Sequence, residues 1–165
     1  MAEVVGLGLS SRASAMVREF VQKHRWYLLA GVVLLALTLV SDPFPSPSHA
    51  EILDAIRMVE SGGRDDCPDG DGGKAIGPFQ IHENYWRDAV AFDPSIGPGN
   101  GFSYQDCRDR DYAMRVVDAY MTRWIPDAWA AADAETIART HNGGPRGAEK
   151  SSTEGYWQRV RKRLD

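Results

Sequence analysis

Residues 52–63, which read Ile-Leu-Asp-Ala-Ile-Arg-Met-Val-Glu-Ser-Gly-Gly, predict a short helix that ends in a carboxylate. The apolar side chains recur at helical spacing along one side, namely Ile52, Leu53, Ile56 and Val59. The glycine pair at 62–63 then stops the helix. Glu60 therefore lies in the last turn, where apolar neighbours and the helix dipole both favour a protonated carboxyl. Such a group suits a general acid, and an ordinary exposed helix end is the alternative.

A loop rich in aspartate and glycine follows the helix over residues 65–73. Asp71 is flanked by glycines, so solvent or loop amides should keep its carboxylate ionised. A turn cluster or a weak calcium site is the alternative for these aspartates, although their spacing does not match an EF-hand loop. Acid–base chemistry on a sugar bond requires one protonated and one ionised carboxyl. Together, Glu60 and Asp71 predict a glycosidase.

The first fifty residues have the pattern of an export signal rather than of a folded core. A basic flank precedes an apolar run at 26–40, and the sequence Ser-His-Ala at 48–50 resembles a cleavage site. The run has 15 residues, fewer than the roughly 20 that span a bilayer, so an uncleaved membrane anchor is the less favoured alternative. We expect residues 1–50 to be a signal peptide and the protein to be secreted or periplasmic. Membrane contact is expected only if this segment stays uncleaved.

Residues 51–165 suit one compact domain with a single core, which we expect to be a monomer. Of the 19 basic and 23 acidic residues in the chain, 15 and 20 fall in this part, so its formal net charge is −5. An acidic domain is a poor candidate for binding nucleic acid, because phosphate contacts need clustered Lys and Arg. The basic run at 159–163 is interpreted as a solvated helix face.

Cys67 and Cys107 are the two cysteines of the chain. In an oxidising compartment they could form one disulfide, although the sequence does not place their Cα atoms within bonding range. Two lone cysteines without nearby histidines do not have the ligand spacing of a zinc site. We therefore expect neither a metal nor another cofactor.

The rest of the domain is predicted to be mainly helical. Turn and helix signals predict a loop or short hairpin at 74–81 and helices at 83–91, 104–124, 133–141 and 156–164. The second of these helices has apolar residues at helical spacing, and we expect it to be the central core helix, ended by Pro126. Asp133 suits the N-cap of the third. The pattern predicts an α+β, mainly helical domain with one small loop or hairpin lobe.

Polar and aromatic side chains supply further candidates for ligand contact. His141 and Asn142 end a predicted helix and could present polar groups to a ligand. Flat faces for sugar rings could come from Tyr85, Trp86, Tyr156 and Trp157, although most aromatic residues are expected to pack in the core. A serine–histidine nucleophile has no support from a Gly-x-Ser-x-Gly elbow.

The chain resembles a known family, the invertebrate-type lysozymes or destabilases. The resemblance is carried by residues 59–63 (Val-Glu-Ser-Gly-Gly), 77–81 (Gly-Pro-Phe-Gln-Ile) with Tyr85-Trp86 after them, and 141–147 (His-Asn-Gly-Gly-Pro-Arg-Gly), continuing to Ser152-Thr153 and Tyr156-Trp157. The order and spacing of these segments cover nearly all of residues 51–165. The block at 141–147 is long and unusual in composition, so chance is a poor explanation.

The resemblance implies a lysozyme-like fold and hydrolysis of the β-1,4 bond between N-acetylmuramic acid and N-acetylglucosamine in peptidoglycan. The family's catalytic glutamate falls on Glu60. Its catalytic aspartate lies in the following loop, which is shorter here, so Asp71 is the best match and Asp69 the fallback. Substrate contacts are implied for Gln80, Tyr85, Trp86, His141, Asn142 and Gly143. The expected partner is peptidoglycan or an amino-sugar oligosaccharide.

Two departures from the family pattern change the expectations. Animal members are rich in cysteine and this chain has two, so it should depend more on its core. Members with isopeptidase activity are thought to use a serine before residues 77–81 and a lysine just after them. Gly73, Ala75 and His82 occupy these stretches here, so isopeptidase activity is not expected. A lytic transglycosylase and a non-catalytic peptidoglycan-binding module are the alternatives to a muramidase.

Overall fold

The computed structural model describes residues 15–16, 18–24 and 46–164. The chain forms two compact units, Met1–Pro45 and Ser46–Asp165. The described residues of the first unit are helical, whereas the predicted apolar run at 26–40 lies outside the described residues. Among the residues that are described, no helix has both the length and the apolar character needed to cross a membrane.

The first helix of the second unit, α2 (His49–Ser61), begins earlier than the sequence pattern predicts. Ser48 is its N-cap, and the Ser48 hydroxyl accepts a hydrogen bond from the Glu51 amide while the Glu51 carboxylate accepts one from the Ser48 amide, at 3.3 and 2.7 Å. His49 donates from Nε2 to the carbonyl oxygen of Trp129 at 2.6 Å. The end is as predicted, because Gly62 stops the helix in the left-handed conformation.

A small hairpin lobe follows α2. Its strands β1 (Ala75–Ile76) and β2 (Ile81–His82) are antiparallel, and Ile76 pairs with Ile81. Gly77 turns the chain between them with φ 72°, and a Cβ atom there would lie 1.9 Å from the carbonyl oxygen of Cys107. No side chain fits in that contact, so glycine is required. The predicted hairpin lobe is confirmed, and its backbone packs directly on the segment around Cys107.

The remaining elements are helices and single 3₁₀ turns. In order they are the turn η1 (Asp71–Gly73), α3 (Glu83–Phe92), η2 (Pro94–Ile96), η3 (Pro98–Asn100), η4 (Tyr104–Arg108), α4 (Arg110–Trp124), α5 (Pro126–Ala130), α6 (Ala134–Gly143), η5 (Gly147–Glu149), η6 (Ser151–Thr153) and α7 (Glu154–Arg161). The single helix predicted at 104–124 is wrong in its first part, because Asp109 caps a new helix by accepting from the Tyr112 amide at 2.9 Å. Asp133 caps α6 as predicted.

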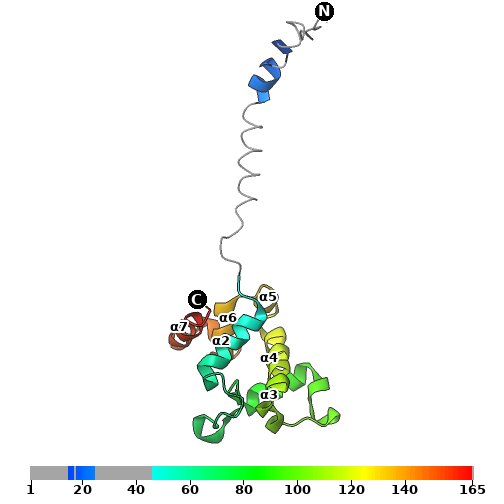
Figure 1. Cartoon of the computed structure of the whole chain (residues 1–165). Coiled ribbons are helices and arrows are strands. Elements are labelled where there is room, and N and C mark those ends of the chain that lie inside the picture. The colour runs from blue at the N-terminus through cyan, green and yellow to red at the C-terminus, as the bar shows by residue number, and fades with distance from the viewer. Residues whose placement is uncertain (1–14, 17, 25–45, 165) are drawn as a thin grey trace, which may run out of the picture. The chain divides into compact units, whose positions relative to one another are not determined.

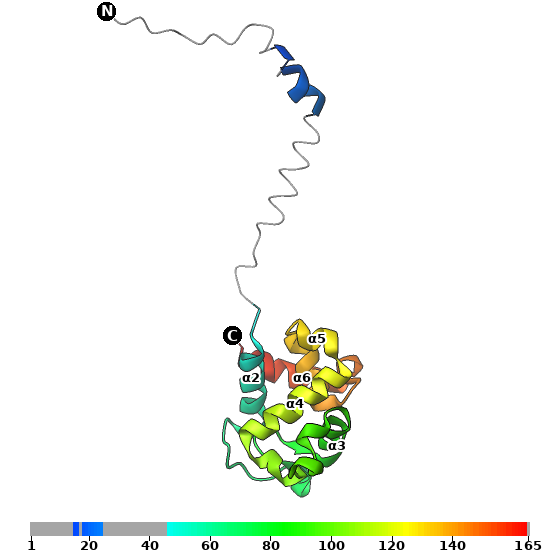
Figure 2. The same cartoon turned by 90° about the vertical axis from the view of Figure 1, so that its right-hand side faces the viewer.

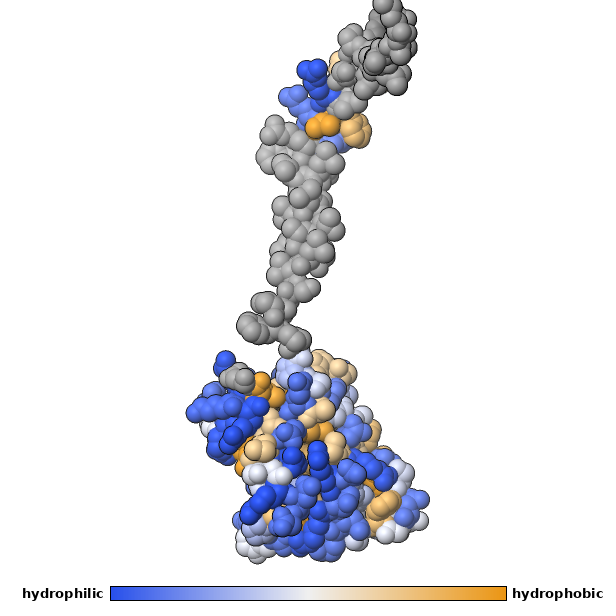
Figure 3. Space-filling model, viewed as in Figure 1, coloured by the Kyte–Doolittle hydropathy of each residue, from blue (hydrophilic) through white to orange (hydrophobic). Residues whose placement is uncertain are grey.

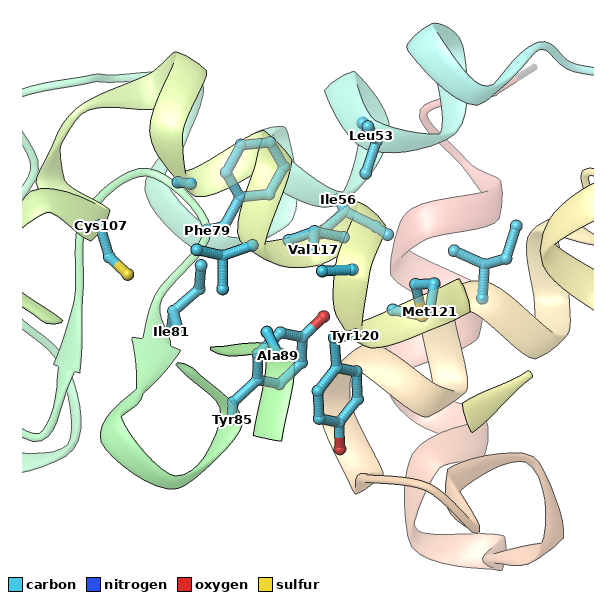
Figure 4. Close-up of a cluster of buried hydrophobic side chains, with 14 of the residues drawn as sticks. Leu53, Ile56, Phe79, Ile81, Tyr85, Ala89, Cys107, Val117, Tyr120 and Met121 are labelled. Carbon is cyan, nitrogen blue, oxygen red and sulfur yellow. The ribbon is translucent and has the colours of Figure 1, made fainter. Parts of the chain in front are cut away.

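The core of the domain is built around α4, against which α3, α5 and α6 pack, while α2 packs on α6 and α7 (Figures 1 and 2). The buried residues of α4 are Tyr112, Ala113, Val116, Val117, Ala119, Tyr120 and Met121. Ile56 of α2 and Phe79 of the hairpin converge on Val117 of this face (Figure 4). Each fully buried aliphatic side chain contributes about 1.5–3 kcal/mol. The mainly helical α+β fold with a central helix is therefore confirmed.

The surface of the domain is largely hydrophilic in the view of Figure 3, with small separate apolar spots. The basic run at 159–163 belongs to the end of α7 and the residues after it, and all of its basic side chains are exposed. The interpretation of this run as a solvated helix face agrees with that exposure.

The start of α2 gives a prediction about stability. Hydrogen bonds from the Ser48 amide, and then from its hydroxyl, hold the pKa of Glu51 below its ordinary value of 4.5. Ser48→Ala should lower the free energy of unfolding by about 0.5–2 kcal/mol in urea titrations at pH 7. Because the pKa of Glu51 is lowered in the folded state, the part of the stabilisation that comes from its carboxylate is present above pH 4.5 and is lost as the pH falls through the lowered value.

Ser152→Ala is the matched control, because Ser152 is also exposed and caps no α-helix. It should change the stability by less than about 0.5 kcal/mol.

A chain that begins at Glu51 lacks both Ser48 and His49, so it should unfold at a lower temperature than one that begins at Ser46. Equal midpoints for the two chains would contradict a structural role for residues 46–50.

Candidate active site

Glu60 lies at the meeting point of three helices. It is one residue before the end of α2, and its side chain is 19% exposed. Tyr156 of α7 donates from its hydroxyl to Oε1 of Glu60 at 2.7 Å. His141 of α6 places Nε2 3.8 Å from the same oxygen. The candidate acid predicted from the sequence is therefore largely buried and held by residues that lie more than 80 positions away in the chain.

His141 is more buried than its predicted role in substrate contact suggests, with a side chain 4% exposed. Nε2 donates to the carbonyl oxygen of Phe79 at 3.0 Å, and Nδ1 lies 3.5 Å from the hydroxyl of Tyr85. Burial lowers the pKa of His141 below 6.5, against the opposing effect of the Glu60 charge. The imidazole is therefore neutral at pH 7, and a proton on Nε2 leaves Nδ1 free to accept from Tyr85.

The two candidate aspartates have different surroundings. Asp69 accepts two hydrogen bonds from the guanidinium of Arg108, which lower the pKa of Asp69. Asp71 is 64% exposed and has φ 47°, and its Oδ2 lies 3.7 Å from Nε2 of His82. The carboxylate of Asp69 is thus already paired, whereas that of Asp71 is open to solvent at the start of η1.

A groove of about 440 Å³ collects most of the residues predicted to contact substrate. Its lining residues are Gln80, Ile81, His82, Asn84, Tyr85, Asp88, Tyr120, His141, Asn142, Gly143, Gly144 and Pro145. Asn142 is exposed and so has its amide available to a ligand. His141 lines the groove and also lies beside Glu60, so it connects the groove to the candidate acid.

Trp86 is the predicted contact residue that lies outside this groove. It is 8% exposed, and its indole N–H donates to the hydroxyl of Tyr112 at 2.7 Å, which in turn donates to the carbonyl of Ile96. Its ring therefore packs in the core. Tyr85 stacks on Tyr120 with ring centroids 3.5 Å apart, so one face of Tyr85 is covered as well (Figure 4).

Gln80 fixes the loop and the hairpin to each other. Its side-chain amide donates to the carbonyls of Gly77 and Pro68 at 2.9 and 3.3 Å. A Cβ atom at Gly70 would lie 2.3 Å from Oε1 of Gln80, so the loop backbone passes directly over this side chain. Gln80 thereby orders the loop that carries the candidate aspartates.

The predicted disulfide is not formed, because both cysteines are free thiols. Cys107 is completely buried, and burial raises the pKa of its thiol to about 12. Cys67 lies in the loop, where its sulfur is 3.5 Å from the amide nitrogen of Gln80. Among the described residues, no three or more His, Cys, Asp and Glu side chains are grouped so that they could hold a metal ion.

Two residues that matter here were not identified from the sequence in these roles. The sequence predicts a sugar-binding face for Tyr156, but its ring is buried and its hydroxyl is directed at Glu60. Nothing in the sequence pattern singles out Arg108, which pairs with Asp69. A tyrosine near the start of the last helix and an arginine 39 positions after an aspartate carry no local signal, because both contacts depend on the tertiary fold.

The chain matches known proteins over most of the second unit. A family model described as Destabilase matches residues 49–163. The lysozyme of Meretrix lusoria is 40% identical over 112 residues, covering 67% of this chain and 85% of that protein. The lysozyme of Ostrea edulis is 36% identical over 138 residues, covering 81% and 91%. The lysozyme of Magallana gigas is 42% identical over 87 residues, but the match spans just over half of that protein, 58%.

Solved structures give the same result for the fold. The inhibitor-bound lysozyme from Meretrix lusoria matches with a TM-score of 0.55 at 37% identity, over 71% of this chain and 90% of that one. The lysozyme of Tapes japonica matches with a TM-score of 0.57 at 30% identity, over 70% and 89%. The resemblance inferred from the sequence motifs is confirmed, and the chain belongs to the destabilase family of invertebrate-type lysozymes.

Proposed function

We propose that this lysozyme-type glycosidase cleaves the β-1,4 bond between N-acetylmuramic acid and N-acetylglucosamine in peptidoglycan. Glu60 is the general acid and Asp71 the second carboxylate. The observation that carries the proposal is the position of Glu60, a largely buried carboxyl beside His141, which lines the groove. A carboxyl is one of the side chains that can serve as the general acid in the cleavage of a glycosidic bond.

The proposed reaction uses these two carboxyl groups in turn. Glu60 transfers its proton to the glycosidic oxygen as the bond from that oxygen to the anomeric carbon breaks. Asp71 stabilises the positive charge that develops on the sugar ring, or attacks the anomeric carbon. Water then supplies the hydroxyl of the new reducing end and returns a proton to the enzyme.

The assignment of Asp71 rather than Asp69 is supported by their surroundings. A carboxylate that accepts two hydrogen bonds from Arg108 must break them before it can approach a sugar. Asp71 has no such requirement, because it is exposed and its neighbour His82 is 3.7 Å away. Gly72 follows it with φ 64°, which lets the chain turn sharply and present the carboxylate.

We also propose that the domain acts outside the cytoplasm, as a secreted or periplasmic monomer directed there by residues 1–50. Cleavage after Ala50 stays a prediction, and an uncleaved anchor is the less favoured alternative. Cleavage there would fall inside α2 and remove both Ser48 and His49. The acidic net charge of residues 51–165 supports a partner other than nucleic acid.

Glu60→Gln should strongly reduce turnover, because the amide cannot donate the acidic proton. The clearing of a peptidoglycan suspension should slow by about 10²–10⁴-fold. Glu83→Gln is the matched control, since Glu83 is an exposed helix residue paired with Arg87, and it should clear at the wild-type rate. Undiminished clearing by Glu60→Gln would remove Glu60 from the mechanism.

Asp71→Asn should lower kcat by about 10²-fold or more while the melting temperature stays close to wild type, because Asp71 is exposed. Asp69→Asn should instead leave kcat within a few-fold and weaken the partly exposed pair with Arg108, with little effect on stability. The reverse pattern of kcat values would transfer the role to Asp69.

Mass spectrometry of the products separates hydrolysis from the action of a lytic transglycosylase. Reducing ends are expected for hydrolysis. Anhydro ends, together with near wild-type activity of Asp71→Asn, would show that the sugar closes on itself without water. Tight binding of peptidoglycan with no turnover at any pH would favour a non-catalytic binding module.

A further inference from the structure

We infer that Tyr156 is a positioning residue for the general acid. Its hydroxyl donates a hydrogen bond to Oε1 of Glu60, so the proton that Glu60 transfers lies on Oε2. The inference rests on the proposed role of Glu60 and adds to it a specific oxygen and the residue that selects it. Tyr156 itself is buried and has no proposed contact with substrate.

The contact joins two helices that are far apart in the chain. Tyr156 is near the start of α7 and Glu60 near the end of α2, 96 residues away, and these two helices pack against each other. Figures 1 and 2 show α7 and α2 side by side in both views. The O···O distance of 2.7 Å is that of a well-formed hydrogen bond between a hydroxyl and a carboxyl oxygen.

The direction of this hydrogen bond is set by the chemistry of the two groups. Burial first, and then the charge of Glu60, raise the pKa of Tyr156 well above its ordinary value of 10. The hydroxyl therefore keeps its proton throughout the neutral range and donates it to Oε1. When the carboxyl is protonated, its own proton then belongs on the other oxygen, Oε2.

His141 faces the same oxygen as Tyr156. Its Nε2 lies 3.8 Å from Oε1 and donates at shorter range to the carbonyl of Phe79. Because burial keeps the imidazole neutral, it places a polar N–H rather than a full positive charge beside the carboxyl. The other charged group near Tyr156 is the guanidinium of Arg159, which lies 5.3 Å from the ring centroid on an exposed part of α7.

A fixed carboxyl matters because the last torsion of a glutamate side chain is broad and roughly two-fold. Without an anchor, the protonated oxygen of Glu60 can exchange places with the other one. A proton donor that is displaced by about 1 Å can lose about 10²-fold in rate. A single hydrogen bond to Oε1 selects one orientation before the substrate arrives, so the proton is already on the oxygen that must release it.

Tyr156→Phe tests the inference, because it removes the hydroxyl and keeps the buried ring. We expect kcat on a soluble amino-sugar oligosaccharide to fall about 10- to 100-fold while KM stays within twofold. In the Glu60→Gln background the same change should cause no further loss. A wild-type kcat for Tyr156→Phe, or a change confined to KM, would overturn the inference.

Tyr112→Phe is the matched control. It removes the hydroxyl of another buried tyrosine, which bonds Trp86 and the carbonyl of Ile96 in the core. This variant should lower the melting temperature and leave kcat within twofold of wild type, which separates a general loss of packing from loss of the Glu60 contact. An equal fall in kcat for both variants would reduce Tyr156 to a structural role.

Infrared spectroscopy supplies a measurement that does not need turnover. The C=O stretch of protonated Glu60 is identified as the band that Glu60→Gln removes, and Tyr156→Phe should move it to higher frequency because the oxygen loses a hydrogen bond. An unchanged band would overturn the inference even in an active enzyme. If Tyr156→Phe shifts the band but the wild type has no glycosidase activity, the proposed function fails while the contact and the oxygen assignment stand.

Discussion

The packing of α2 against α6 and α7 is the constraint on which the site depends. Glu60, His141 and Tyr156 come from these three helices. They are far apart in the sequence and meet only because the helices pack together. Residues of α4, α6 and α7 supply much of the buried apolar surface that keeps α2 in place. The hydrophobic core thus determines where the carboxyl lies, and the polar contacts determine how it is oriented.

With both cysteines free, the domain relies on local backbone interactions in addition to its core. Side-chain caps start three of the helices: Ser48 for α2, Asp109 for α4 and Asp133 for α6. Each cap satisfies an amide that would otherwise lack a partner, and each is worth about 1 kcal/mol. In a domain whose net stability is about 5–15 kcal/mol, three such contributions are a substantial share.

The parts of this structure that are local in sequence could be predicted, and those that depend on distant contacts could not. The end of α2 and the cap at Asp133 were predicted because glycine and aspartate act on their nearest neighbours. The sequence pattern around Ser48 predicts a cleavage site, whereas in the structure Ser48 caps α2. A helix cap and a small-residue cleavage pattern use the same residue types, so the sequence does not separate them. The burial of Trp86 and the contact of Tyr156 follow from tertiary packing, which periodicity does not encode.

The contact of Gly77 with the carbonyl of Cys107 has a consequence for how a polysaccharide chain can enter. It joins the hairpin to η4, while Arg108 of η4 holds Asp69 and Gln80 of the hairpin holds the loop backbone at Pro68. Loop, hairpin and η4 are therefore cross-linked at several points. A polysaccharide chain that enters would therefore meet the loop, the hairpin and η4 as one connected unit, in which the loop aspartates keep their place relative to the hairpin.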